Sequence, residues 1–203
     1  MADRYSEVIT QYSQTIGNSL AAFLFKHWLD LINLFLLMVI SGSLLAPYLA
    51  SFGHSSESRA IYAIYHIACH EKESRCLFLL GHKMSLCARC FSIYLSLFIL
   101  GFFWNIFTHR RKGILPVNFK VAFLLVIPLI LDVTSQALGL RESTNVLRIF
   151  TGFCLSLSIV LYLYPKLKME IEELDSISKR TLSIERQEEI KLPYTGTQNQ
   201  EEI

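Results

Sequence analysis

One stretch of the chain concentrates the residue types that bind metal ions or exchange disulfides. Residues 66–90 read HIACHEKESRCLFLLGHKMSLCARC, with four cysteines (Cys69, Cys76, Cys87, Cys90) and three histidines (His66, His70, His82). Cys87 and Cys90 form a Cys-x-x-Cys pair, whose two thiolates can reach one ion from a single turn of chain. Upstream lies the pair Cys69-His70, with 16 residues between His70 and Cys87, a spacing common in zinc sites.

Three interpretations of these residues compete. In the first, a tetrahedral metal site, with zinc or iron, takes its ligands from Cys69, His70, His82, Cys87 and Cys90. In the second, Cys87 and Cys90 are a redox pair that exchanges disulfides with Cys69 and Cys76 and passes electrons to a quinone at the membrane edge. In the third, the four cysteines form two structural disulfides in an oxidising compartment. The neighbouring histidines favour the metal, because disulfides do not need them.

A second polar set predicts a binding pocket. Asp132 and Gln136 are four residues apart, so they share a helix face, and an acidic group at membrane depth normally faces the protein interior. The predicted ligand-binding residues are Asp132, Gln136, Arg141, Ser143, Thr144, Asn145 and Arg148. Two arginines beside a helix N-terminus suit a phosphate or carboxylate group. The alternative is structural: an Asp132–Arg148 pair fixes helix packing, and Ser143 or Thr144 caps a helix.

Four apolar stretches must position these residues. They span about 31–52, 90–108, 121–140 and 146–165, each close to the roughly 20 residues that cross a bilayer as a helix. We therefore predict an all-α integral membrane protein with a bundle of four transmembrane helices. The formal net charge of +2 gives no case for nucleic-acid binding. Because the chain is predicted to span the membrane, the expected partners are the lipid bilayer and a further membrane protein.

Basic residues predict the orientation. The loop between the second and third spans contains His109-Arg110-Arg111-Lys112, and short basic loops stay in the cytoplasm. We therefore expect a plasma-membrane protein with both termini cytoplasmic and with the Cys/His loop at 53–89 outside. Residues 1–27 are predicted to form an amphipathic segment on the inner surface, and residues 28–165 the membrane domain. Residues 166–203 are predicted to form a cytoplasmic tail, partly disordered from about Ser178.

These motifs resemble those of an uncharacterised prokaryotic family of small predicted membrane proteins. The first match is Cys69-His70, Ser74-Arg75, Gly81 and Cys87-Ala88-Arg89-Cys90. The second is Leu131-Asp132, Gln136, Gly139, Arg141, Ser143-Thr144-Asn145, Arg148 and Thr151-Gly152. The chain departs from the pattern at Glu71, where the family has Gln, and at Cys76, where it has no fixed cysteine. The resemblance covers about residues 60–165 and implies membership and architecture, but no activity.

The predicted function is therefore a Cys/His site, most simply a metal site, beside a polar pocket for an anionic or membrane-soluble ligand. If the protein is an enzyme, His82 and Asp132 are the candidate catalytic residues, and the chemistry would be metal-assisted. The alternatives are a quinone-linked thiol–disulfide oxidoreductase that uses Cys87 and Cys90, which would be similar in architecture to other four-helix enzymes of that type, and a structural accessory subunit of a membrane complex.

Overall fold

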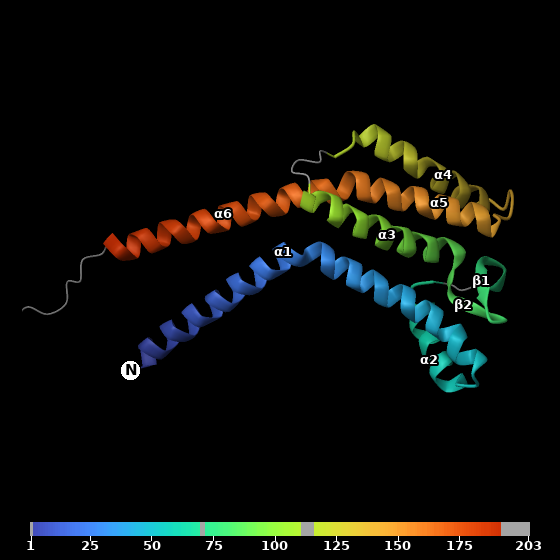
Figure 1. Cartoon of the computed structure of the whole chain (residues 1–203), viewed down its shortest axis with the longest axis horizontal. Coiled ribbons are helices and arrows are strands. Elements are labelled where there is room, and N and C mark those ends of the chain that lie inside the picture. Colours follow the sequence, from blue (N-terminus) through green and yellow to red (C-terminus); the bar gives the residue numbers. More distant parts are fainter. Residues whose placement is uncertain (1, 70–71, 111–115, 192–203) are drawn as a thin grey trace, which may run out of the picture. The chain divides into compact units, whose positions relative to one another are not determined.

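The computed structural model describes residues 2–69, 72–110 and 116–191. Within these residues, four helices are long and apolar enough to cross a membrane: Phe23–Ser51, Ala88–Phe107, Phe119–Ala137 and Asn145–Ile177. The prediction of an α-helical membrane protein with four spanning helices is confirmed (Figure 1).

The elements follow one another along the chain with short connections. In order they are α1 (Ala2–Ser51), α2 (Ser55–His66), the 3-10 turn η1 (Glu73–Arg75), β1 (Cys76–Leu79), β2 (His82–Cys87), α3 (Ala88–Arg110), α4 (Phe119–Ala137), α5 (Asn145–Ser158), the π-helical turn η2 (Ile159–Leu163) and α6 (Tyr164–Lys191). The chain divides into two compact units, residues 1–26 with 168–203, and His27–Leu167. All the site residues discussed below belong to the second unit.

Helix α5 packs against both α3 and α4. Small residues permit its close approach to α3: a Cβ added at Gly152 would lie only 2.9 Å from the backbone oxygen of Arg89. Two hydroxyl groups donate to main-chain oxygens across the same contact, Ser92 Oγ to Ile149 O at 2.7 Å and Ser156 Oγ to Ile93 O at 3.0 Å. Small residues and interhelical hydrogen bonds are what holds helices together where lipid removes the hydrophobic driving force.

The described residues between the first two spans contain α2 and a two-stranded antiparallel hairpin, and the sequence predicts no strand in this outer loop. Leu79 pairs with His82 around the two-residue turn Leu80-Gly81, and both turn residues have positive φ, 52° and 81°. Such turns match the twist of the strands they join, and Leu80 is an unusual occupant because its Cβ disfavours this conformation. The sequence does not predict these strands because they are short and because their cysteines and histidine are read more readily as metal ligands than as strand residues.

Helix α6 continues to Lys191, beyond Ser178, where the sequence analysis expects ordered structure to fade. Its first turns carry an i,i+4 pair between Lys168 and Glu172, with 3.9 Å between the charged atoms, of the kind that supports a solvated helix. The predicted amphipathic face of residues 1–27 lies largely outside the described side chains, and residues 192–203 lie outside the described chain.

Candidate functional site

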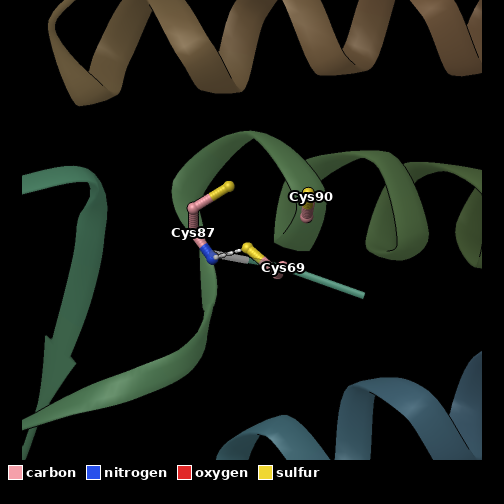
Figure 2. A group of neighbouring side chains, drawn as sticks. All are labelled: Cys69, Cys87 and Cys90. Carbon is pink, nitrogen blue, oxygen red and sulfur yellow. Dashed lines mark hydrogen bonds between the residues drawn. The ribbon is translucent and has the colours of Figure 1, made fainter. Parts of the chain in front are cut away.

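Three cysteine sulfurs gather at the start of α3. The Sγ atoms of Cys69, Cys87 and Cys90 all lie within 4.8 Å of one another, and no disulfide joins them. Cys69 is buried, and the other two are partly buried. Figure 2 shows Cys87 and Cys90 on the turn that opens α3, with Cys69 from the segment that follows α2. The backbone N–H of Cys87 donates to the Cys69 sulfur at 3.4 Å, which holds the two segments together at the cluster.

Cys69 is placed by α2, which is fastened to α1 along one face. Ser58 Oγ donates to Ala46 O at 2.8 Å, and the Tyr65 hydroxyl donates to Val39 O at 2.6 Å, beside Gly42, which has no side chain to block it. Burial, aided by the nearby Tyr94, raises the pKa of the Tyr65 hydroxyl, so this group remains a donor at neutral pH. The Cys69 N–H then donates to Tyr65 O at 2.9 Å and ends the helix.

Cys87 and Cys90 are placed by the hairpin. Strand β2 ends at Cys87, and α3 begins at the next residue, so both cysteines fall on one turn. The hydroxyl of Tyr62 donates to Lys83 O, which ties β2 to α2, and Ser85 Oγ reaches Ser43 O on α1 at 3.5 Å. The cluster is therefore built from two segments, each fixed to the same frame.

Cys76 pairs with Cys87 across the hairpin through the backbone. Its side chain is only 2% exposed, yet its sulfur does not belong to the three-sulfur group. Cys76 thus supports the strand that carries Cys87.

A buried carboxylate joins the cysteine turn to the end of α4. Asp132 is 1% exposed, and its two oxygens bind two arginines. Arg89, which lies between Cys87 and Cys90 in the chain, donates to Oδ2, and Arg141 Nη2 donates to Oδ1 at 3.1 Å. The Gln136 amide also donates to Oδ2, at 3.0 Å. Arg89 therefore connects the cysteine cluster to the polar pocket directly.

Arg148, 4% exposed, has neutral partners instead of a carboxylate. Its Nη1 donates to Asn145 Oδ1 at 3.2 Å and its Nη2 to Gln136 Oε1 at 3.3 Å. The Asn145 amide donates to Cys76 O at 3.3 Å, which fastens the α4–α5 turn to the hairpin at the same end of the bundle (Figure 1). The Asp132–Arg148 pair considered above is thus replaced by Asp132 with Arg89 and Arg141.

A half-open hollow of about 320 Å³ lies on this network. Its lining residues are Arg75, Gln136, Gly139, Arg141 and Glu142. Gly139 has a φ of 68°, which lets the chain turn sharply out of α4 and bring Arg141 back toward Asp132. The Ser135 hydroxyl accepts a hydrogen bond from Arg141 Nε at 3.1 Å and fixes that side chain against α4.

The predicted residues fall into three groups. Cys69, Cys87 and Cys90 come together, and Asp132, Gln136, Arg141, Asn145 and Arg148 form one hydrogen-bonded network. Thr144 caps α5 by accepting from the Leu147 N–H at 3.4 Å, while Ser143 is buried beside it.

Of the two histidines predicted as ligands, the structure describes only His82, which is not part of the sulfur group. His70 lies outside the described residues. His82 is exposed at the start of β2, five residues before Cys87, which corresponds to about 16 Å of strand. This arrangement does not bring His82 to the three sulfurs.

The predicted set omits two arginines: Arg75, which lines the hollow, and Arg89, which pairs with Asp132. Their signal in the sequence is proximity to cysteine: Arg75 precedes Cys76 directly, and Arg89 lies inside Cys-Ala-Arg-Cys.

Comparison with known proteins is consistent with this architecture. Residues 69–162, which include the cysteine cluster and the polar network, match the family model described as "Predicted membrane protein (DUF2085)". A protein of Methanocaldococcus jannaschii, described as "Uncharacterized protein MJ1492", is 37% identical over 145 residues, covering 69% of this chain and 92% of that protein. The chain belongs to this family.

A second relative comes from Methanothermobacter thermautotrophicus and is described as "Uncharacterized protein". It is 39% identical over 89 residues, covering 41% of this chain and 73% of that protein. No solved structure matches the chain. The family description supports the assignment of the chain as a membrane protein, and it names no activity.

Proposed function

We propose that this membrane protein binds a metal ion, zinc in the first place, through Cys69, Cys87 and Cys90, beside a pocket for an anionic or membrane-soluble ligand. The single observation that carries the proposal is the convergence of three sulfurs within 4.8 Å from two separately anchored segments. Thiolates about 2.3 Å from a tetrahedral zinc ion lie about 3.8 Å from one another, so a small contraction closes this cluster on an ion.

The surroundings of the sulfurs suit a metal thiolate centre. Three thiolates and one divalent ion carry a net negative charge. The positive guanidinium of Arg89, on the same turn, would stabilise that charge. The N–H of Cys87 that donates to the Cys69 sulfur is a contact of the kind that orients metal ligands. Soft thiolate donors select zinc or iron over magnesium and calcium.

The fourth ligand position defines what the centre can do. His70 follows Cys69 directly in the chain and would complete a closed Cys₃His site, which is structural. If instead water or substrate takes the fourth position, the ion can activate it, and the arginines of the adjoining pocket are placed to hold an anionic substrate. We place this site on the outer face of the plasma membrane, with both termini in the cytoplasm.

Metal content and thiol count of the detergent-purified full-length protein test the proposal. We expect about one zinc or iron per chain, lost when Cys87→Ser and Cys90→Ser are combined. Cys154→Ser is the matched control, because this buried cysteine on α5 lies outside the sulfur group and its loss should leave the metal in place.

The thiol count separates the redox alternative. A metal-free protein in which reduction releases two additional thiols would overturn the metal centre and make Cys87 and Cys90 a disulfide pair. Loss of those thiols on adding a quinone would then identify the electron acceptor.

A further inference from the structure

The charges around the pocket do not balance. Four arginines belong to this region. Arg75 and Arg141 line the hollow, Arg89 binds Asp132, and Arg148 bonds to Gln136, whereas the carboxylates are Asp132 and Glu142. Asp132 is already shared by Arg89 and Arg141. Two positive charges therefore remain over within this group of described residues, and one of them, on Arg148, is buried.

A buried guanidinium without an anionic partner is costly, particularly at the end of a membrane-spanning bundle. Arg148 is 4% exposed and bonds only to the neutral amides of Gln136 and Asn145, while the charges of Arg75 and Arg89 act against its own. An anion in the hollow would relieve this repulsion. Gln136 lines that hollow and lies between it and Arg148.

Hydrogen-bond donors also remain unused. Arg89 Nε is buried and has no hydrogen-bond partner in the described part of the chain. No hydrogen bond or ion pair engages the Arg75 side chain within those same residues, although it lines the hollow. Arg141 uses Nε and Nη2 and has its Nη1 hydrogens left.

We infer that the pocket binds a phosphate group, held between the guanidiniums of Arg75 and Arg141. Arg75 can offer a phosphate a bidentate contact, and Arg141 can donate from Nη1 to another oxygen of the same group, since its Nε and Nη2 already bind Ser135 and Asp132. The hollow of about 320 Å³ exceeds a bare anion and falls at the lower end of small-ligand sites, so it leaves room for part of a head group. Glu142 also lines the hollow, and its charge leaves the two guanidiniums of Arg75 and Arg141 in excess there.

The phosphate has two possible sources with the same chemistry. Arg75 immediately precedes the hairpin, and Arg141 lies on the turn between two spans, so the hollow opens at the end of the bundle. A lipid head group and a dissolved phosphate compound can both reach that level. The inference rests on the proposed pocket for an anionic or membrane-soluble ligand. It does not depend on the proposed metal centre.

The test is the thermal stability of the full-length protein in neutral detergent, after lipid removal, with inorganic phosphate, acetate or chloride at equal ionic strength. A second arm adds phosphatidic acid, or diacylglycerol as its phosphate-free match, in mixed micelles of the same detergent. We expect phosphate or phosphatidic acid to raise the Tm, and Arg75→Gln to weaken the apparent affinity about tenfold or more, the size expected for one charge-assisted contact. Arg59→Gln is the matched control, since Arg59 is an exposed arginine on α2 whose Nε donates to Ser55 O.

Each outcome decides something. A response to phosphate that Arg75→Gln removes and Arg59→Gln retains supports a soluble phosphate ligand, and the same pattern with phosphatidic acid alone supports a lipid head group. A response to acetate and not to phosphate overturns the phosphate assignment while the pocket stands. No response to any of these anions overturns both the inference and the anion pocket, and the metal content of the same sample shows separately whether the metal centre holds.

Discussion

Arg89 occupies two sites at once. It lies between two of the three clustered cysteines in the chain, and its guanidinium binds the buried carboxylate of Asp132 on α4. The position of the cysteine turn therefore depends on an ion pair with a carboxylate that Arg141, a lining residue of the hollow, also binds.

Asp132→Asn is expected to destabilise the protein strongly. The change removes the charge that both Arg89 and Arg141 bind, and a buried ion pair broken on one side typically costs about 3–5 kcal/mol. Arg141→Gln should cost clearly less, because the Arg141 side chain is 47% exposed and water can replace its contact. Thermal unfolding in detergent measures both, and equal stability of Asp132→Asn and the unmodified protein would contradict this network.

At the residue scale, the sequence predicts which side chains belong to the site more reliably than it predicts the residues that each of them contacts. The spacing of Cys87 and Cys90 is enough to group them, since a Cys-x-x-Cys pair needs only one turn of chain, whereas Cys69 is brought to them by the fold of α2 and the hairpin. The partners of Asp132 depend on how α3, α4 and α5 are rotated about their axes. Arg148, 16 residues away along the chain, is an obvious candidate, yet the structure brings Arg89, 43 residues away, to this carboxylate.

At the scale of elements, the contact between α3 and α5 positions the site. Gly152 lies against the backbone of Arg89, with the Cβ of Ser92 3.2 Å from where a Gly152 Cβ would be. The segment that carries Cys87 and Cys90, the proposed metal ligands, thus also packs on α5. Any separation of these two helices must move the cysteine turn.

Gly152→Ala is expected to force that separation. The added methyl group would meet a main-chain oxygen at 2.9 Å, which cannot move aside as a flexible side chain would, and overpacking of this kind costs about 1–3 kcal/mol. Val146→Ala on the same helix is the control, because Val146 is 78% exposed. Thermal unfolding and metal content are measured on both variants. A Gly152→Ala protein as stable as the control would contradict the close approach of α5 to the backbone of Arg89.

The spanning helices could be predicted because length and hydrophobicity alone define them. The hairpin could not be predicted in the same way. Its strands, Cys76–Leu79 and His82–Cys87, are short, and the turn holds Leu80 at positive φ where Asn, Asp or Gly would be the usual signal. The hairpin is instead stabilised by its contact with α2, where the Tyr62 hydroxyl donates to Lys83 O.

At the scale of the whole molecule, the four spans bring the chemistry to one end of the bundle. The cysteine cluster, the hairpin and the α4–α5 turn are joined there by the Arg89–Asp132 and Asn145–Cys76 contacts. The opposite end of α3 instead packs in an apolar cluster that contains Leu29, Trp104, Val160 and Tyr164. The proposed metal centre and the proposed anion pocket therefore lie at the same end of the bundle.

The proposed orientation predicts the accessibility of two inserted tags. Gly53 lies in the exposed turn between α1 and α2, and a tag inserted after it should be cleaved by protease added to intact cells. A tag inserted after Lys112, one span further along, should be protected until the cells are lysed. The reverse result would invert the orientation, and accessibility of both tags from the same side would contradict the four-span topology.

The most direct measurement for the central claim is X-ray absorption spectroscopy at the edge of the bound metal, on the purified full-length protein. The account predicts a first shell with three sulfur atoms at about 2.3 Å and one lighter ligand, nitrogen or oxygen, at about 2.0–2.2 Å. Cys87→Ser should reduce the sulfur count to two. A first shell of nitrogen and oxygen atoms alone would contradict a metal centre built from Cys69, Cys87 and Cys90.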